Sequence, residues 1–380
     1  MSLHGRPKGE YRSAQRVGCL MSTRRQCGQW LGALALAGCQ SPPPAAPPLR
    51  QPRPLWPRPP EQPRYVFEAT LRNAASLQDA TENASLRRRL TGDDDGRASF
   101  GKPFAVAASQ GRIYVTDTEG RRVFVFDVPR RRTFSFGLRL EGALKKPSGI
   151  ALDGQGRVYV VDTTARRLVI YDSLGLYLGE IDGSADWTRP TAVAVDAAGE
   201  RIHVLDTGGV ESQRHRICTY GAQHRLLGTL GRRGSGDGEF NLPADAAVAA
   251  DGTLWVLDAG NFRVQAFSAE GRYLRQFGGV GTGVGQLARP RGLALAPDGR
   301  VCVSDALLCN VQVFQPDGRL LLALGGRATR DEPGRYLLPA RLGCDETGRL
   351  YVVDQYLHKI EVLRPLSDAE GQRWLAAPLG

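Results

Sequence analysis

The sequence predicts an all-β protein, a six-bladed β-propeller whose blades each hold four strands. Six segments of similar pattern follow one another along the 380-residue chain, which indicates repeated structural units. Within each segment apolar residues alternate with polar ones, and this period of two is typical of half-buried strands rather than of helices. A high content of glycine (46 residues) and proline (24 residues) fits many short strands joined by turns.

Each repeat opens on a proline and an apolar run, carries a second run that ends in aspartate, and continues into a third. Residues 157–162 (RVYVVD) are an example of the second run. The opening prolines lie 43 to 53 residues apart, and a fourth short apolar run closes most repeats. Four strands in about 45 residues match one blade, and blades packed around an axis bury sheet faces that a single blade would expose. The repeats span residues 103–126, 147–171, 190–220, 243–267, 290–314 and 339–363.

Two recurring motifs resemble those of NHL repeats, a propeller-forming family. One is the run at 156–162 (GRVYVVD), and the other is the glycine-rich segment 278–287 before the fifth repeat. The resemblance covers residues 103–364 and implies a six-bladed propeller with a rigid, flat surface. It implies no particular activity, because one fold serves many functions.

A propeller must also close its ring, and the sixth repeat lacks an obvious outer strand after Leu363. Residues 64–71 (RYVFEATL) have the outer-strand pattern, so we expect this N-terminal segment to complete the sixth blade. Residues 372–376 (QRWLA) are a weaker competitor. Residues 72–101 are expected to form an irregular connection, with one short helix near residues 84–90.

Residues 1–38 are expected to be an upstream extension and a signal peptide that starts at Met21. A charged start, a short apolar stretch at residues 30–37 and small residues before a cleavage point are typical of secretory signals. Residues 36–39 (LAGC) resemble the lipobox of bacterial lipoproteins, which implies that Cys39 carries a lipid and becomes the mature N-terminus. Gln40 follows the cysteine where an aspartate would signal retention in the inner membrane, so we expect the protein at the outer membrane, on its periplasmic face.

Residues 39–63 are expected to form a spacer between the lipid and a propeller domain at residues 64–380. Eleven of the 24 prolines lie between Pro42 and Pro63, a composition that favours an extended polyproline II chain. The alternative is a proline-rich ligand for another domain.

The basic charge of the chain is weak evidence for a nucleic-acid partner. The formal net charge is +11, but beyond residue 39 there are 44 basic residues against 38 acidic ones. Arginine clusters such as residues 130–132 suit a solvated surface or contact with anionic lipid and polysaccharide. Export from the cytoplasm also argues against RNA, so no nucleic-acid partner is expected.

An aspartate ends the second strand of every repeat, and a ring of six carboxylates resembles a metal site at first sight. A residue that every blade carries is better explained by a need that every blade shares. We therefore expect each carboxylate to accept hydrogen bonds from backbone N–H groups of the following turn. The six residues are Asp117, Asp162, Asp206, Asp258, Asp305 and Asp354.

Function is expected where the repeats differ, and the first difference lies near the channel mouth. Two residues after the proline, four blades have a small residue: Ala105, Gly149, Ala192 and Gly292. The fourth and sixth blades have Asp245 and Arg341 there, and Arg291 lies one position earlier in the fifth blade. These three residues are candidates for binding a small anion or a charged residue of a partner. The favoured alternative is an ion pair that plugs the channel.

The second difference is a longer turn between the second and third strands of the third blade. Ile217 lies eleven positions after Asp206, where the corresponding distance in the other blades is six positions. An enlarged loop on a rigid scaffold is a candidate contact site, although a neutral insertion is equally plausible. The candidate contact residues are Glu211, Arg214 and His215.

No metal ligands or cofactor are expected from the sequence. The five histidines show no ligand spacing, and His203 occupies a position that other blades fill with aromatic residues, so a packing role is expected. Cys302 and Cys344 lie on neighbouring blades, where a disulfide is possible in an oxidising compartment and free thiols are commoner. The leading hypothesis is thus a non-enzymatic scaffold that binds an envelope protein. The alternative is a metal-dependent hydrolase or lyase acting at the channel mouth.

Overall fold

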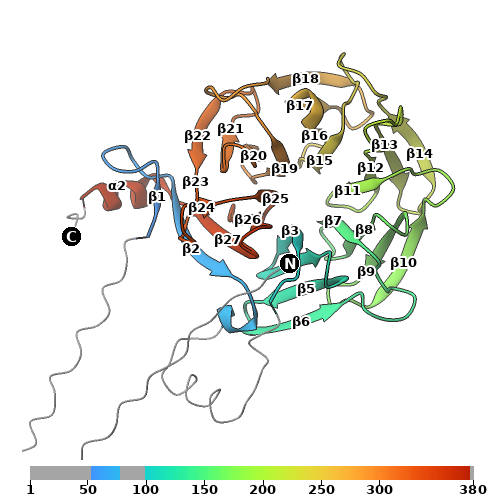
Figure 1. Ribbon diagram of the computed structural model, residues 1–380, viewed down its shortest axis with the longest axis horizontal. Coiled ribbons are helices and arrows are strands. Elements are labelled where there is room, and N and C mark those ends of the chain that lie inside the picture. The colour runs from blue at the N-terminus through green and yellow to red at the C-terminus, as the bar shows by residue number, and fades with distance from the viewer. Residues whose placement is uncertain (1–52, 78–98, 377–380) are drawn as a thin grey trace, which may run out of the picture. The chain divides into compact units, whose positions relative to one another are not determined.

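The computed structural model describes residues 53–77 and 99–376. These residues form a β-propeller whose blades are arranged around a central channel (Figure 1). Cys39, the predicted signal peptide and the predicted helix near residues 84–90 lie outside the described residues. None of the helices described is long and apolar enough to span a bilayer.

The propeller has six blades, which are five four-stranded sheets and one five-stranded sheet. Blade 1 contains β3 (Pro103–Ser109), β4 (Arg112–Asp117), β5 (Arg122–Asp127) and β6 (Arg132–Phe136). Blade 2 contains β7 (Pro147–Leu152), β8 (Val158–Asp162), β9 (Arg167–Tyr171) and β10 (Tyr177–Asp182). Blade 3 contains β11 (Pro190–Val195), β12 (Arg201–Asp206), β13 (Arg216–Gly221) and β14 (Leu226–Leu230).

The remaining blades follow the same antiparallel order. Blade 4 contains β15 (Pro243–Val248), β16 (Leu254–Asp258), β17 (Arg263–Phe267) and β18 (Tyr273–Gly278), with the short helix η3 (Ala259–Asn261). Blade 5 contains β19 (Pro290–Leu295), β20 (Val301–Asp305), β21 (Asn310–Phe314) and β22 (Leu320–Leu324). Blade 6 contains β25 (Pro339–Cys344), β26 (Leu350–Asp354), β27 (Lys359–Pro365), β2 (Tyr65–Leu71) and β1 (Leu55–Trp56). Outside the blades lie η1 (Ala74–Leu77), the parallel pair β23 (Gly326–Arg327) and β24 (Arg335–Tyr336), and α2 (Asp368–Ala376).

The hydrophobic core is divided into six clusters, one between each pair of neighbouring blades. Between blades 1 and 2, for example, Val123 and Val125 pack with Val158 and Val160. Alternate residues of each inner strand point to opposite faces of the sheet, so both faces of a blade become buried by its neighbours. The predicted six-bladed all-β fold is confirmed.

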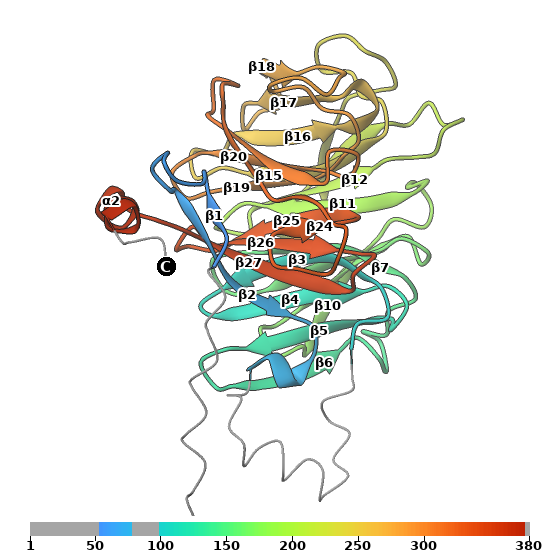
Figure 2. The ribbon, with the colours of Figure 1, turned by 60° about the vertical axis from the view of Figure 1, so that its left-hand side comes forward.

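The ring is closed by β2, which pairs antiparallel with β27 as an outer strand of blade 6. The register aligns Val66 with Arg364 and Leu71 with Ile360. Figure 2 shows β2, in blue, beside β27, in red. Tyr65 and Leu71 are buried, so the N-terminal strand contributes to the clusters on both faces of the last blade.

The competing segment at residues 372–376 does not form a strand, because it belongs to helix α2. Ser367 and Glu370 start this helix with reciprocal hydrogen bonds: each side chain accepts from the other residue's backbone N–H, at 3.0 and 3.3 Å. This capping pattern favours a helix over a strand. Within α2, only Gly371 is buried.

The predicted spacer is wrong for residues 53–63, which fold onto blade 6. Strand β1 pairs with β2, aligning Leu55 with Val66, and the Arg64 N–H donates to the Trp56 carbonyl at 2.7 Å. Trp56 also packs against the cluster between blades 5 and 6. The outer edge of β2 has unpaired backbone groups, and β1 forms hydrogen bonds with them while Trp56 covers the adjacent apolar surface.

The closing strand yields a stability prediction. Replacing Tyr65 with alanine removes a fully buried aromatic side chain from the cluster between blades 5 and 6. The free energy of unfolding in urea should fall by about 3–5 kcal/mol. Tyr356→Ala is the matched control, because Tyr356 is 67% exposed, and it should change stability by less than about 0.5 kcal/mol. Equal effects of the two variants would show that β2 does not hold the ring together.

Candidate functional site at the channel mouth

The repeated aspartates are buried hydrogen-bond acceptors that hold the start of each blade. In blade 5, one oxygen of Asp305 accepts the backbone N–H groups of Ala288 and Arg289 at 2.7 and 2.9 Å. Its other oxygen accepts those of Leu307 and Leu308 at 2.9 and 3.0 Å. Each of the other five carboxylates likewise binds at least one N–H of the segment before the blade's proline, and Asp117, Asp162 and Asp354 also bind their turn. The predicted contact with the following turn is thus confirmed for four aspartates and wrong for Asp206 and Asp258, which accept no backbone N–H from the described residues of that turn.

These bonds also determine what surrounds the mouth of the channel. In five blades the N–H of the residue before the proline binds the buried carboxylate, whereas in blade 4 the N–H of Leu242 binds His215. In four blades the side chain of this residue is basic and exposed. We call the face on which these residues lie the mouth face. Its ring consists of Lys102, Lys146, Arg189, Leu242, Arg289 and Leu338.

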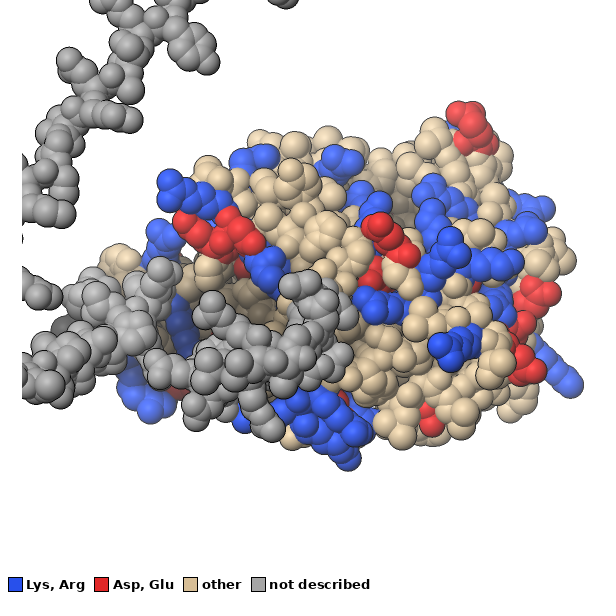
Figure 3. All heavy atoms as spheres, turned by 60° about the horizontal axis from the view of Figure 1, so that its bottom comes forward, with Lys and Arg blue, Asp and Glu red and all other residues tan. Residues whose placement is uncertain are grey.

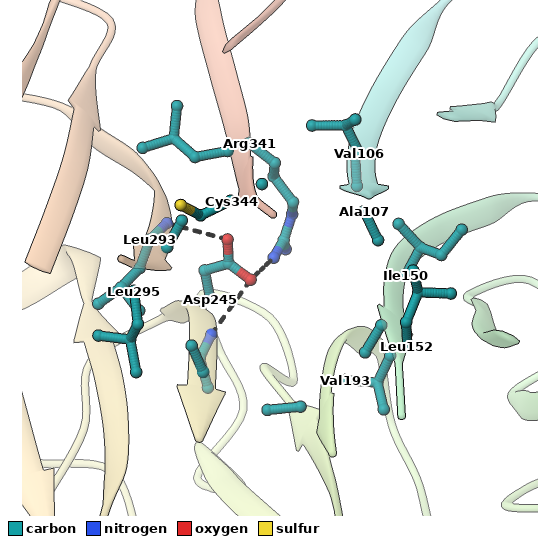
Figure 4. A pocket seen from close by; sticks show the side chains of 18 of the residues that line it. Val106, Ala107, Ile150, Leu152, Val193, Asp245, Leu293, Leu295, Arg341 and Cys344 are labelled. Carbon is teal, nitrogen blue, oxygen red and sulfur yellow. Dashed lines mark hydrogen bonds and ion pairs between the residues drawn. The ribbon is translucent and has the colours of Figure 1, made fainter. Parts of the chain in front are cut away.

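Asp245 and Arg341 form a buried ion pair across the top of the channel (Figure 4). Asp245 also accepts the backbone N–H of Leu293 at 3.0 Å, while Arg341 donates to the Thr191 carbonyl at 3.2 Å. The Arg341 guanidinium lies 5.3 Å from the centre of the Phe104 ring. The pair therefore connects five of the six blades.

This arrangement is the ion-pair plug expected as the alternative to an open binding cluster. Burial raises the pKa of Asp245, while Arg341 and two backbone N–H groups act in the opposite direction. Each charged group has hydrogen-bond partners that replace the water it lost, which a buried pair requires.

Beneath the plug, the channel is lined by the innermost strands, whose side chains there are mainly apolar. Its cavity is about 230 Å³, and Val106, Ile150, Val193 and Leu293 project around it (Figure 4). Asp245 and Arg341 are the charged residues in its lining.

Above the plug lies a wider pocket of about 490 Å³, which we call the mouth hollow. Arg189, Arg289, Arg291 and Arg341 line it, and no acidic residue does among those that the structure describes. Its apolar walls include Phe104, Leu242, Pro243, Phe262 and Pro290.

Arg291 shares the hollow with Arg341 but does not join the ion pair. Its side chain has no hydrogen bond or ion pair with the described part of the chain, and it is half-buried. Burial and the neighbouring charges of Arg341 and Arg289 lower its pKa. The three predicted mouth residues are thus brought together, with two of them neutralising each other.

The predicted contact loop of blade 3 is partly exposed. Glu211 and Arg214 are exposed, and the Arg214 guanidinium donates to the Asp186 carbonyl at 2.9 Å. The prediction of His215 as a contact residue is wrong, because its side chain is fully buried. Its ring nitrogens bond to the Gly209 carbonyl at 3.0 Å and the Leu242 N–H at 3.2 Å, so His215 ties the loop to blade 4.

Other titratable residues within the blades have structural surroundings. His203 is buried, and its Nδ1 forms a hydrogen bond of 2.9 Å with the Thr219 hydroxyl. Burial lowers the pKa of His203 to about 4. Cys302 and Cys344 are free thiols. The described residues contain no group of three or more histidine, cysteine, aspartate or glutamate side chains placed to hold a metal ion.

Comparison with known proteins identifies the repeat. Residues 240–267, which contain β15, β16 and β17 of blade 4, match the sequence model of the NHL repeat. A mouse protein described as NHL repeat-containing protein 3 is 33% identical over 76 residues. This chain is an NHL-repeat propeller. The matched segment covers 20% of this chain and 21% of the mouse protein, so the likeness concerns a fraction of that relative.

Solved structures with the same fold include enzymes. A structure described as a streptogramin B lyase matches the NHL propeller with a TM-score of 0.52 and 13% identity, over 70% of this chain and 94% of that one. A gluconolactonase from Xanthomonas campestris matches with a TM-score of 0.52 and 17% identity, over 70% of this chain and 87% of that one. A hydrazine synthase from Kuenenia stuttgartiensis matches with a TM-score of 0.52 and 15% identity, over 69% of this chain and 83% of that one. At these identities the likeness establishes the fold alone.

Sequence reasoning missed three residues of the mouth hollow: Arg189, Arg289 and Gln355. For the arginines a signal was present, because the residue before the blade's proline is basic in four of six repeats of the NHL propeller. Nothing in the sequence distinguished Gln355, which follows the last repeated aspartate, from an ordinary turn residue.

The aspartate role can be tested in blade 5. Asp305→Asn keeps the shape but removes one of the two acceptor oxygens, each of which now binds two backbone N–H groups. The free energy of unfolding should fall by about 1–3 kcal/mol, because buried donors lose their acceptor. Asp317→Asn, at an exposed turn, is the control and should have little effect. An Asp305→Asn variant as stable as the unmodified chain would contradict the structural role of the aspartate.

The plug can be tested by a double-mutant cycle in urea. Asp245→Ala leaves the buried Arg341 guanidinium without its counter-ion, and stability should fall by about 3–5 kcal/mol. Adding Arg341→Met removes the uncompensated charge and should restore part of the loss. Additive effects of the two substitutions would mean that the pair is not coupled.

Proposed function

We propose that this NHL propeller is a non-enzymatic binding protein of the cell envelope that engages a partner protein through its mouth face. A lipid on Cys39 holds it at the outer membrane, with the propeller in the periplasm. The observation that carries the proposal is the contrast between the blocked channel and the open hollow above it.

The groups that line the hollow are suited to binding. Arg291 and the exposed arginines of the ring offer charged donors, and the proline and aromatic walls offer apolar contact area. The hydroxyls of Thr191 and Thr207 bond to each other, and Thr207 donates to the Pro243 carbonyl at 2.8 Å. A concave site with mainly apolar walls and a few convergent polar groups is typical of a recognition surface.

The scaffold beneath the hollow supports a preformed surface. Five blades share the Asp245–Arg341 plug, and the buried aspartates hold every segment that leads into an innermost strand. A surface that is already ordered loses little conformational entropy when a partner binds.

The anchor is supported by the sequence before the propeller. Residues 36–39 (LAGC) follow an apolar stretch and a basic start, as a lipoprotein signal requires. Because residues 53–63 pack on blade 6, residues 40–52 are the chain that separates Cys39 from the propeller.

Cys39→Ala tests the anchor. After membranes are pelleted from cells, the unmodified chain should be in the pellet and Cys39→Ala in the soluble fraction, without incorporation of an alkyne-labelled fatty acid. Cys27→Ala is the matched control, because Cys27 precedes the expected cleavage point and should leave both readouts unchanged. Incorporation of the fatty acid into Cys39→Ala would refute the anchor.

The binding role is tested by crosslinking in isolated envelopes. A reproducible protein partner, lost when Arg189 and Arg289 are both replaced by glutamine, is the expected result. Recovery of no partner, or stoichiometric zinc or calcium in the purified propeller, would count against the proposal and favour a metal-dependent hydrolase or lyase.

A further inference from the structure

We infer that the mouth hollow is a carboxylate-binding site for an acidic, partly apolar peptide segment, with Arg291 as its central anion-binding residue. The nature of the ligand as part of a partner protein rests on the proposed function. The existence of an anion site rests on the charges, burial and hydrogen bonding of the hollow itself.

The first argument is the uncompensated charge of the hollow. Of its four arginines, Arg341 is neutralised by Asp245. Arg189, Arg289 and Arg291 have no ion pair with any residue that the structure describes. By contrast, Arg263 is more deeply buried and pairs with Asp258 at 2.9 Å. Like charges held together repel one another, and a bound carboxylate relieves that repulsion.

The second argument is the burial of Arg291. Its guanidinium has lost part of its hydration without gaining a partner, and its lowered pKa reflects that burial and the charges of Arg341 and Arg289. A guanidinium presents a planar fork of donors that matches the two oxygens of a carboxylate. Binding of such a group would supply the hydrogen bonds that Arg291 lacks.

The third argument is a buried amide at the edge of the same hollow. Gln355 lines the hollow and is 7% exposed, yet its Nε2 has no acceptor among the residues described. Buried donors almost always have a partner, so an unpaired one beside a cationic pocket indicates a place for an acceptor oxygen. The Gln355 amide and the Arg291 guanidinium are both donors, and an anion satisfies both.

The walls of the hollow select a peptide rather than a nucleic acid. Phe104, Leu242 and Phe262 offer apolar contact beside the arginines, and the volume of about 490 Å³ is in the usual range for an enclosed ligand. Nucleic acid requires a run of cations along a backbone. Here the arginines are gathered at one hollow, and acidic side chains lie among the basic ones on the side seen in Figure 3.

Fluorescence anisotropy with the mature chain, residues 39–380 in detergent, tests the site. The probe is a labelled ten-residue peptide that alternates glutamate and leucine, and its counterpart has glutamine in place of glutamate. The glutamate peptide should bind, and Arg291→Gln should weaken binding about tenfold or more, the loss expected for one charge-assisted contact. Arg291→Lys should recover part of the affinity.

Arg319→Gln is the matched control, because Arg319 is an exposed arginine of the turn between β21 and β22, and its side chain has no ion pair within the described blades. It should leave binding unchanged. Thermal unfolding followed by circular dichroism verifies that Arg291→Gln is folded, and Arg289→Gln provides a second, exposed substitution of the site. Equal binding of both peptides, or equal binding to Arg291→Gln, would overturn the inference. Tighter binding of oligothymidylate or of phosphatidylglycerol vesicles than of the glutamate peptide would overturn it as well.

The outcomes separate this inference from the proposed function. If a crosslinked partner is recovered equally with Arg291→Gln but is lost when Arg189 and Arg289 are replaced, the mouth face binds a protein without the carboxylate site, and the inference fails alone. If the glutamate peptide binds through Arg291 but envelopes yield no partner, the anion site stands and the proposed function fails.

Discussion

The buried aspartate at the end of each second strand is the interaction on which the propeller depends. Its carboxylate binds backbone N–H groups of the segment that leads into the innermost strand of the same blade, as Asp305 does with Ala288 and Arg289. Without that acceptor, these N–H groups would be buried and unpaired, which is costly. Six such contacts fix six neighbouring segments around the axis, and so they define the rim of the channel mouth.

The same contacts explain why the mouth is basic. A residue whose N–H is held beside the buried carboxylate directs its own side chain outward, and four blades place a lysine or arginine there. The six aspartates at the strand ends already have partners: they bind backbone N–H groups and, as with Asp258 and Arg263, form local ion pairs. They therefore leave the cations of the rim without nearby counter-charges, which is the physical origin of the anion site that we infer.

The two charged residues that break the sixfold pattern block the channel, whereas the basic residues of the rim surround the hollow above it. Asp245 and Arg341 replace small residues at the start of two innermost strands, and their pairing fills the axis. The blocked channel and the open hollow are thus products of one substitution pattern. Ring closure by β2 and the pairing of β1 with β2 bring residues 55–71 onto the last blade.

Much of the fold was determined by local sequence. The period-two runs, the recurring prolines and aspartates, and the pattern of residues 64–71 predicted the blades, the structural role of the carboxylates and the closing strand, because each depends on neighbours close in sequence or on a repeated pairing rule. The contact of each carboxylate with the segment before the proline was not predicted. The tertiary structure decided the rest. Asp245 and Arg341 are 96 residues apart and meet only because the ring closes, which leaves Arg291 without a partner. Burial of His215 and the folding of residues 53–63 onto β2 likewise depend on surfaces that exist only after the blades assemble. Side-chain partners across a channel are set by the geometry of the whole ring, and no local pattern encodes them.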